Sequence, residues 1–88
     1  MKDPRLVVGT IVYAKETLPL AMDGSGPVCE YGEAGTVAHI HTLTSAEDPP
    51  RTASFPLVDF KLGRRACYDY TWTLALSLDD LARAALVA

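Results

Sequence analysis

Short segments in which apolar and polar residues alternate, separated by glycine and proline, constrain this fold more than any other feature. Four segments are rich in β-branched and aromatic residues and are short enough for strands. The turns between them contain the residues that most often interrupt regular structure. The expected strands are Leu6–Glu16, Gly35–Leu43, Ala53–Leu62 and Ala66–Leu76. This pattern predicts a mainly β chain that folds as a small, strongly bent antiparallel sheet or barrel.

The C-terminal segment Ser77–Ala88 changes to a helical period. Ser77 and Asp80 fit a variant of the capping box, with Asp where Glu or Gln is usual. Asp79 and Asp80 fall in the first turn, where the helix dipole favours acidic side chains. The apolar stripe of this segment consists of Leu78, Leu81, Ala82 and Ala85. We expect a short amphipathic C-terminal helix or, alternatively, a turn followed by a short strand at "ALVA".

The segment before this helix predicts the largest apolar face of the sheet. Its alternate residues are aromatic or aliphatic: Tyr68, Tyr70, Trp72, Leu74 and Leu76. An aromatic row can also stack the bases of single-stranded nucleic acid, but the acidic net charge and the lack of interleaved basic residues oppose this use. We therefore expect the row in the core. Phe55 and Phe60 fall on opposite faces of the preceding strand, so at most one of them joins that core directly.

The chain of 88 residues has a net charge of −3 and is expected to form a single domain. Its charges are spread without blocks, which opposes general binding to a nucleic-acid backbone. The one basic cluster, Lys61–Arg65, falls at an expected Gly63-Arg64 hairpin turn and is interpreted as a solvated loop. No run approaches the ~18 apolar residues of a membrane span, and the N-terminus lacks the apolar core of a signal peptide. These features predict a cytoplasmic protein without a membrane or nucleic-acid partner.

A long irregular segment, Thr17–Gly35, separates the first two expected strands. It contains several turn-forming glycines and prolines, and long loops in small domains are often functional. We expect residues 17–33 to form the main contact surface for a larger protein, with help from the acidic turn Thr44–Pro50. The candidate partner-binding residues are Leu18, Leu20, Met22, Asp23, Tyr31 and Glu33.

Two histidines, His39 and His41, are separated by one residue on an expected strand. Side chains two apart on a strand point to the same side, so both imidazoles can converge on one zinc or copper ion. Such an ion needs further ligands, which Cys29, Cys67, Asp or Glu would supply, although no sequence spacing places them. Two surface or structural histidines without a metal are the alternative interpretation.

The two cysteines, Cys29 and Cys67, belong to no CxxC motif. We expect buried free thiols, with a redox pair or a shared metal as the alternative. Cys67, His39 and Asp69 are the residue types of an activated thiol, but no local signature joins them and a chain this short leaves little room for a walled pocket. The glycine-containing "DGSGP" and "GEAG" lack the lysine and helix of a phosphate loop. An autonomous enzyme is therefore not expected.

Several short motifs follow one another in a characteristic order along the chain. The strand motif G-x-x-V at "GTIV" is followed by the long loop, by G-x-x-G-x-V at "GEAGTV", by "PLVDF" and finally by "LSLDDL". This order resembles the SH3-like barrels found as accessory modules of metalloenzyme systems. Similar families are the NifZ-type nitrogen-fixation proteins, the variable chain of ferredoxin–thioredoxin reductase, and the β-subunit of nitrile hydratase with its activator relatives. The likeness to the NifZ-type proteins covers roughly the first two-thirds of the chain and rests on Gly9, Val12, Asp23, Gly24, Gly32, Gly35, Val37 and "LVDF".

The resemblance implies a small antiparallel SH3-like barrel, here with a short C-terminal helix, that docks on or helps mature a larger metal or redox enzyme. We therefore expect a non-catalytic accessory protein without a cofactor. One alternative is a small metal-binding protein that uses His39 and His41 with a cysteine, and another is a nucleic-acid-binding small barrel. A homodimer is a further option, through an open edge strand or through the C-terminal "LARAALVA".

Overall fold

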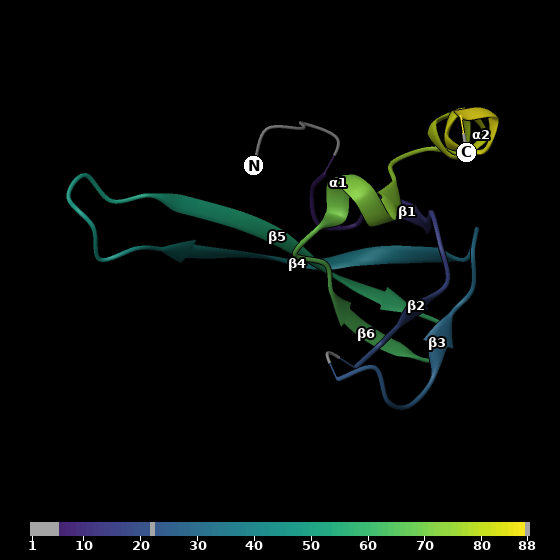
Figure 1. Cartoon of the computed structure of the whole chain (residues 1–88), viewed down its shortest axis with the longest axis horizontal. Coiled ribbons are helices and arrows are strands. Elements are labelled where there is room, and N and C mark those ends of the chain that lie inside the picture. Colours follow the sequence, from purple (N-terminus) through teal and green to yellow (C-terminus); the bar gives the residue numbers. More distant parts are fainter. Residues whose placement is uncertain (1–5, 22, 88) are drawn as a thin grey trace.

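A computed structural model describes residues 6–21 and 23–87 of the chain, in which antiparallel strands predominate (Figure 1). A five-stranded sheet has the order β6-β5-β4-β1-β7, and β2 pairs with β3 in a separate two-stranded sheet. The strands are β1 (Ile11–Ala14), β2 (Leu18–Pro19), β3 (Val28–Cys29), β4 (Ala34–Thr44), β5 (Thr52–Phe60), β6 (Gly63–Ala66) and β7 (Leu74–Ala75). Two helices follow β6, namely α1 (Tyr70–Thr73) and α2 (Leu78–Val87).

The predicted mainly β, antiparallel architecture with a short C-terminal helix is confirmed. The main sheet does not close into a barrel within the described chain, because β6 and β7 remain its two edges. The sheet is compatible in outline with a small SH3-like barrel that stays open between its edge strands. The short strand at "ALVA" is not formed, since α2 continues through these residues to Val87. Ser77 Oγ accepts a hydrogen bond from the Asp80 amide at 3.1 Å, as the capping pattern predicts.

The hydrophobic core lies against the part of the sheet where β1, β4 and β5 are adjacent. Val12, Val37 and Val58 are at most 1% exposed there. A Cβ on Gly35 would lie only 2.6 Å from Val58 Cγ1 and 2.8 Å from Phe60 Cε1. Glycine is thus required at this position because the two neighbouring core side chains occupy the space of any larger residue.

The longest strands, β4 and β5, continue beyond their neighbours as a two-stranded hairpin. Residues 38–56 of this hairpin, which we call the arm, project from the rest of the molecule (Figure 1). Every residue from His41 to Ala53 is exposed. At the tip, the Ser45 amide donates to Arg51 O at 2.8 Å and the Arg51 amide donates to Ser45 Oγ at 3.0 Å. The turn predicted at residues 44–50 is therefore the tip of a long arm.

A β-bulge changes which residues of β4 face the core. The register with β5 shifts between Val37 and His39, so Ala38 is the extra residue. Val37 is buried, whereas His39 is exposed and Ile40 packs against the core. The alternation of the expected strand Gly35–Leu43 also predicts Val37 on the face of the two histidines, and this is wrong because the inserted residue exchanges the two faces.

The predicted fourth strand, Ala66–Leu76, is wrong in its central part. β6 ends at Ala66, and α1 occupies Tyr70–Thr73. The Trp72 and Thr73 amides both donate to Asp69 O, and Thr73 Oγ1 donates to the same carbonyl at 3.2 Å. These local bonds replace the bonds of a strand ladder. Lys61 and Leu62 form the preceding turn in place of the expected Gly63-Arg64.

The row expected in the core is there only in part. Leu74, on β7, is 3% exposed and Leu76 packs against the core, but the three aromatic members lie on a loop and on α1. Trp72 is 80% exposed and Tyr68 is 54% exposed, while Tyr70 is half-buried against the core. The intervening residues, Cys67 and Thr73, are buried in their place. The first expected strand is also shorter than predicted: Gly9 has a φ of 95°, and a turn at residues 7–10 precedes β1.

Phe55 and Phe60 lie on opposite faces of β5, as predicted. Both are 6% exposed, but only Phe60 belongs to the main core cluster. Phe55 instead lies at the base of the arm, where its ring centroid is 5.3 Å from that of His41 and 4.3 Å from that of Tyr68. This small aromatic cluster supports the arm on the face opposite the core.

Candidate interaction surface

Helix α2 presents three distinct faces, which follow from 3.6 residues per turn. Leu81 and Ala84 are half-buried on the face directed to the body of the molecule. Asp79, Asp80 and Arg83 form a charged face, where Arg83 Nη1 lies 3.5 Å from Asp80 Oδ1. The third face, which we call the outer stripe, consists of Leu78, Ala82, Ala85 and Leu86.

The outer stripe is apolar and open to solvent. Leu78 is 62% exposed and Leu86 is 85% exposed. The docked face meets the body at Leu81, whose Cδ2 lies 3.9 Å from the point that a Cβ on Gly32 would occupy. Half of a broad apolar arc is therefore packed inward, and the other half has no cover in the described chain. The helical period of the sequence predicts the arc but not its division into these halves. Leu86 belongs to the same arc by that period but was not among the predicted stripe residues.

The predicted loop surface is only partly available. Leu18 is 4% exposed within the core, and Leu20 is half-buried against it. Met22 lies outside the described residues. Glu33 is half-buried, and its carboxylate accepts hydrogen bonds from the Glu30 and Lys61 amides, each at 3.2 Å. The loop is folded around β2 and β3, so several of its candidate contact residues serve the fold itself.

Two candidate residues of the loop remain on the surface. Tyr31 is 50% exposed, and Asp23 is also exposed. Asp23 Oδ1 accepts hydrogen bonds from Ser25 Oγ at 2.6 Å and the Ser25 amide at 2.9 Å, and these bonds lower the pKa of the Asp23 carboxyl. This Asx-type turn fixes the connection between β2 and β3. The loop and the arm tip, predicted to act as one surface, lie at opposite ends of the molecule (Figure 1).

His39 and His41 lie side by side on one exposed face of the arm. Their ring centroids are 6.3 Å apart, as the two-residue spacing on a strand predicts. Among residues 6–21 and 23–87, no group of three or more His, Cys, Asp or Glu side chains is placed to hold a metal ion. One chain thus brings two imidazoles together without the further ligands that zinc or copper needs.

Both cysteines are buried and unpaired, as expected. Burial raises the pKa of the Cys67 thiol to about 11 and also raises the pKa of Cys29. A thiol nucleophile needs the opposite shift, because the thiolate is the reactive form. The Cys67 Sγ donates to Arg65 O at 3.8 Å, whereas the His39 ring faces that of His41. Cys67, His39 and Asp69 therefore do not form an activated thiol site.

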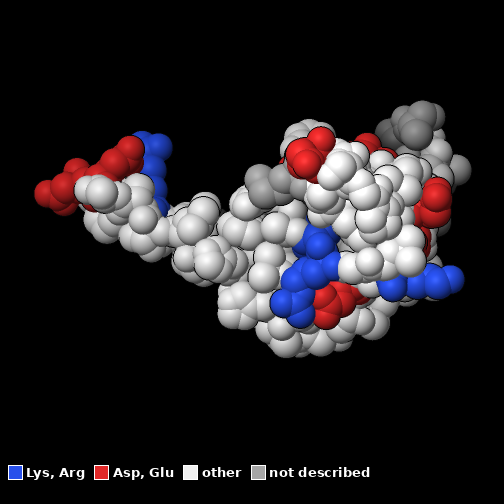
Figure 2. Space-filling view, turned by 90° about the horizontal axis from the view of Figure 1, so that it is seen from below, with Lys and Arg blue, Asp and Glu red and all other residues white. Residues whose placement is uncertain are grey.

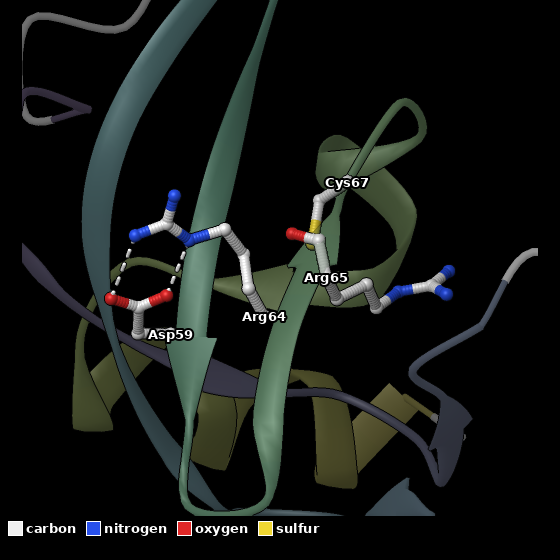
Figure 3. Close-up of polar contacts among 4 residues, drawn as sticks. All are labelled: Asp59, Arg64, Arg65 and Cys67. Atoms are coloured by element: carbon white, nitrogen blue, oxygen red, sulfur yellow. Dashed lines mark hydrogen bonds and ion pairs between the residues drawn. The ribbon is translucent and has the colours of Figure 1, made fainter. Parts of the chain in front are cut away.

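The basic cluster at β6 is engaged with the fold. Arg64 donates from Nε and Nη2 to the two carboxylate oxygens of Asp59, at 2.6 and 3.2 Å (Figure 3). Arg65 points to the other side of β6, where Nη1 donates to Pro19 O at 2.7 Å and Nη2 lies 3.9 Å from an Asp69 carboxylate oxygen. The first contact lowers the pKa of Asp59 through the hydrogen bond from Arg64. These contacts correct the interpretation of the cluster as a merely solvated loop.

Charged residues are absent from the length of the arm. Glu47, Asp48 and Arg51 lie at its tip, but residues 34–46 and 52–58 include no Asp, Glu, Lys or Arg. Figure 2 shows this uncharged surface between the charged tip and the charged patches of the body. The part of the arm between its base and its tip therefore carries no Asp, Glu, Lys or Arg, on a chain with a net charge of −3.

Comparisons with protein-family models, curated proteins and solved structures gave no match. The likeness to SH3-like accessory modules remains a prediction from the sequence motifs. Neither helix of the described chain has the length and apolar character required to span a bilayer.

Proposed function

We propose that this protein is a non-catalytic accessory protein that docks on a larger protein through the outer stripe of α2. The observation that carries the proposal is the exposure of Leu78 and Leu86 on a stripe without a charged residue. Amphipathic helices commonly bind by placing such a stripe into an apolar groove of the partner. Large exposed apolar side chains that are grouped on one helix face indicate an interaction site, whereas single apolar residues scattered over a surface do not.

The charges of α2 indicate the chemistry of the partner. Asp79 flanks the outer stripe on the charged face, and the chain as a whole is acidic. The matching surface is an apolar groove with lysine or arginine along one rim, since complementary charges orient a partner and suppress incorrect ones. The sequence motifs shared with accessory modules favour a larger metal or redox enzyme, or its unmatured form, as that partner.

Capture of partners from the native cell tests this proposal. The tagged wild-type chain is compared with Leu78→Glu/Leu86→Glu, which places two acids on the outer stripe. Arg83→Glu is the matched control, because it adds an acid to the same helix on the charged face. We expect at least tenfold weaker capture for the double variant and retained capture for the control.

Two further measurements make the outcome decisive. Circular dichroism should give the same spectrum for all variants, because the substituted side chains are largely exposed. A Tyr31→Glu variant tests the loop surface in the same assay, and selective loss of capture there would move the contact to the loop. Capture that survives both sets of changes, or turnover of a substrate by the purified chain alone, would contradict the proposal.

A further inference from the structure

One edge of the arm is open along β4. The pairing of β1 with β4 ends at Thr36, and the last backbone bonds on this side join Val37 to Gly9 and Thr10, at 2.8 and 2.9 Å. Along residues 38–44, no strand of the described sheet lies beside this edge. The open stretch is therefore bounded by a turn of the body at one end and by the arm tip at the other.

The backbone of this edge is oriented to accept another strand. The Cys67 amide donates to Pro56 O at 3.0 Å, so the backbone of Pro56 faces β6. Ile40 lies opposite Pro56, and residues opposite each other in an antiparallel pair face either both inward or both outward. The N–H and C=O groups of Ile40 therefore point away from β5, and by the same alternation those of Thr42 and Thr44 do so too. An added strand can form hydrogen bonds to all three residues.

Natural proteins usually block an open edge with charges, proline or a covering element. Residues 38–44 contain no proline and no Asp, Glu, Lys or Arg. The opposite edge of the arm, along β5, contains Pro56. The β4 edge therefore lacks protection by its own sequence, and it is the side of the arm that is suited to strand pairing.

The arm of a second copy does not fit along this edge. If two copies paired antiparallel over the whole stretch, His41 would lie opposite His41, and Ser45 at the start of the second tip would lie opposite Val37. Gly9 and Thr10 already occupy that place through their bonds to Val37. A register moved outward to clear the tip would shorten the ladder. The edge therefore fits a single extended segment of another polypeptide, which has no hairpin tip at its end.

The direction of such a segment follows from β1. This strand runs antiparallel to β4 on the same side, and its line ends where the chain turns at residues 7–10. A segment that runs in the direction of β1 continues that line along the arm and keeps antiparallel pairing, which is slightly more stable per residue than parallel pairing. Its first residue then lies near the arm tip, and its last residue lies near the turn.

The two ends of the open stretch differ in chemistry. At the body end, Val7 and Val8 on the bounding turn are 53% and 61% exposed. At the tip, Glu47 and Asp48 outnumber Arg51, and the whole chain carries a net charge of −3. A segment with a basic first residue and an apolar last residue matches these two ends, because opposite charges attract and apolar side chains gain cover from water.

Between its ends the edge presents two faces without Asp, Glu, Lys or Arg. His39 and His41 point to one exposed face, where the ring centroid of His41 lies 5.3 Å from that of Phe55. Ile40 and Thr42 point to the other face, since successive residues of a strand alternate. Aromatic residues opposite the histidines and β-branched residues opposite Ile40 and Thr42 suit these faces, because such cross-strand pairs stabilise a sheet.

We propose that the β4 edge of the arm binds an extended segment of another polypeptide as an added antiparallel strand. The segment pairs with residues 38–44, carries a basic residue at the tip, alternates aromatic and β-branched residues, and ends with an apolar residue beside Val7 and Val8. Main-chain hydrogen bonds to the edge supply the affinity, and the alternate side chains supply the specificity. This inference uses a different surface from the outer stripe and does not depend on it.

A synthetic peptide with these properties tests the proposal. The probe is Lys-Thr-Val-Thr-Tyr-Val-Tyr-Val amide with a fluorescent label at its N-terminus. Its second to eighth residues are expected opposite Thr44 to Ala38, in that order. Fluorescence anisotropy should show saturable binding to the full chain, with one peptide for each chain. Absence of binding at millimolar concentrations of the chain would overturn the proposal.

Two N-methylated forms of this peptide test the hydrogen bonds. Methylation at the fourth residue removes the N–H that donates to Thr42 O, whereas methylation at the fifth removes an N–H that points away from β4 beside His41. The two peptides have the same composition. We expect binding at least tenfold weaker for the first peptide and nearly unchanged for the second. Equal loss of binding by both peptides would contradict strand addition.

A matched pair of proline substitutions in the chain tests the edge. Thr42 and Ser54 lie opposite each other, and their hydroxyl oxygens are 2.9 Å apart. Both amides face outward, Thr42 on the β4 edge and Ser54 on the β5 edge. Thr42→Pro should abolish binding of the peptide, whereas Ser54→Pro loses the same hydroxyl contact and should retain it. Equal behaviour of two folded variants contradicts pairing through β4.

Amide exchange of the wild-type chain gives a test without substitutions. Saturating peptide should slow exchange of the Ile40 and Thr42 amides by at least tenfold, because both become hydrogen-bonded to the added strand. The Ser54 amide should keep its rate, since its edge remains free. Protection of Ser54 in place of Thr42 would assign the peptide to the β5 edge and refute the proposal.

Discussion

In the body of the molecule β4 and β5 lie against the hydrophobic core, whereas in the arm the same two strands pair with each other alone. Val37 and Val58 are opposite each other in the ladder and at most 1% exposed. Farther along, Leu43 and Ala53 are also opposite each other, but both are exposed. The two strands stay paired on both sides of the bulge at Ala38, so the difference lies in what covers them.

Strand pairing alone is therefore not the source of stability. An isolated two-stranded hairpin is marginal in water, because its backbone bonds replace bonds to water and little apolar area is buried. The arm is anchored by Phe55 between His41 and Tyr68, and beyond this cluster it has only its own ladder and tip. We expect the body half to open only with global unfolding and the arm to open locally at a lower cost.

The largest expected effect tests the body half at its tightest contact. Gly35→Ala places a Cβ 2.6 Å from Val58 Cγ1 and within 3 Å of the Phe60 ring, so the core must shift. We expect a loss of about 3 kcal/mol in the free energy of unfolding, measured by urea denaturation. Thr36→Ala, on the adjacent exposed position of β4, is the control and should cost less than about 1 kcal/mol. Equal costs at these two positions would remove the distinction between a packed and an open face.

The next effect concerns the junction of the body and the arm, where the Cys67 amide donates a hydrogen bond to Pro56 O. Burial raises the pKa of the Cys67 thiol from 9.0 to about 11, so the folded chain keeps a proton that the unfolded chain has lost. The contribution of this thiol to stability is complete below pH 9 and is lost as the pH rises toward 11. The slope is up to about 1.4 kcal/mol for each pH unit in this window.

Urea denaturation between pH 8 and pH 11 measures this slope. Cys67→Ala should remove it, and the difference between wild type and variant isolates the thiol from tyrosine and lysine titration. Cys29→Ala is the control, because Cys29 is the other buried thiol and lies on β3 and not at this junction. A pH dependence unchanged by Cys67→Ala would show that the thiolate forms without opening the junction.

The body was predictable from the sequence where alternation and burial agree. β5, α2 and most of β4 lie where the pattern predicts them. The bulge at Ala38 was not predictable, because Val37 and His39 fit one alternating face in the sequence and only pairing with β5 reveals the extra residue. The prediction for the segment after Ala66 was wrong for another reason. Its alternation is that of a strand, but local hydrogen bonds to Asp69 O form α1.

The candidate sites were predictable to different degrees. The common side of His39 and His41 follows from the two-residue period, and the bulge leaves it intact because it precedes both residues. The burial of Leu18 and the internal contacts of Glu33 depend on long-range packing of the loop, which no local pattern contains. The free edge of the arm likewise depends on where β1 stops, a property of the whole sheet.

A smaller effect is expected at the base of the arm. Tyr68→Ala removes the ring that lies 4.3 Å from Phe55, and we expect a loss of about 1 kcal/mol. Amide exchange should accelerate at Leu43 and Phe55 in the arm while Val37 and Val58 keep their rates. Tyr31→Ala is the control, since Tyr31 is similarly exposed on the loop. Uniform acceleration throughout the sheet would mean that the arm and the body unfold together.

The smallest expected effect lies at the exposed outer strand of the body. Arg64 and Asp59 are opposite each other on β6 and β5, and their side chains are 54% and 48% exposed. The hydrogen bonds from Arg64 lower the pKa of the Asp59 carboxyl. This contact therefore stabilises the fold above the ordinary carboxyl pKa and is lost as the pH falls through the lowered value.

In Arg64→Ala the Asp59 pKa should return toward 3.8, as measured by NMR titration of its carboxyl carbon. The urea midpoint should hardly move, because exposed ion pairs contribute little even with two hydrogen bonds. A large loss of stability would instead show that this contact holds β6 to β5, so that the boundary between body and arm depends on the outer strand as well as on the core.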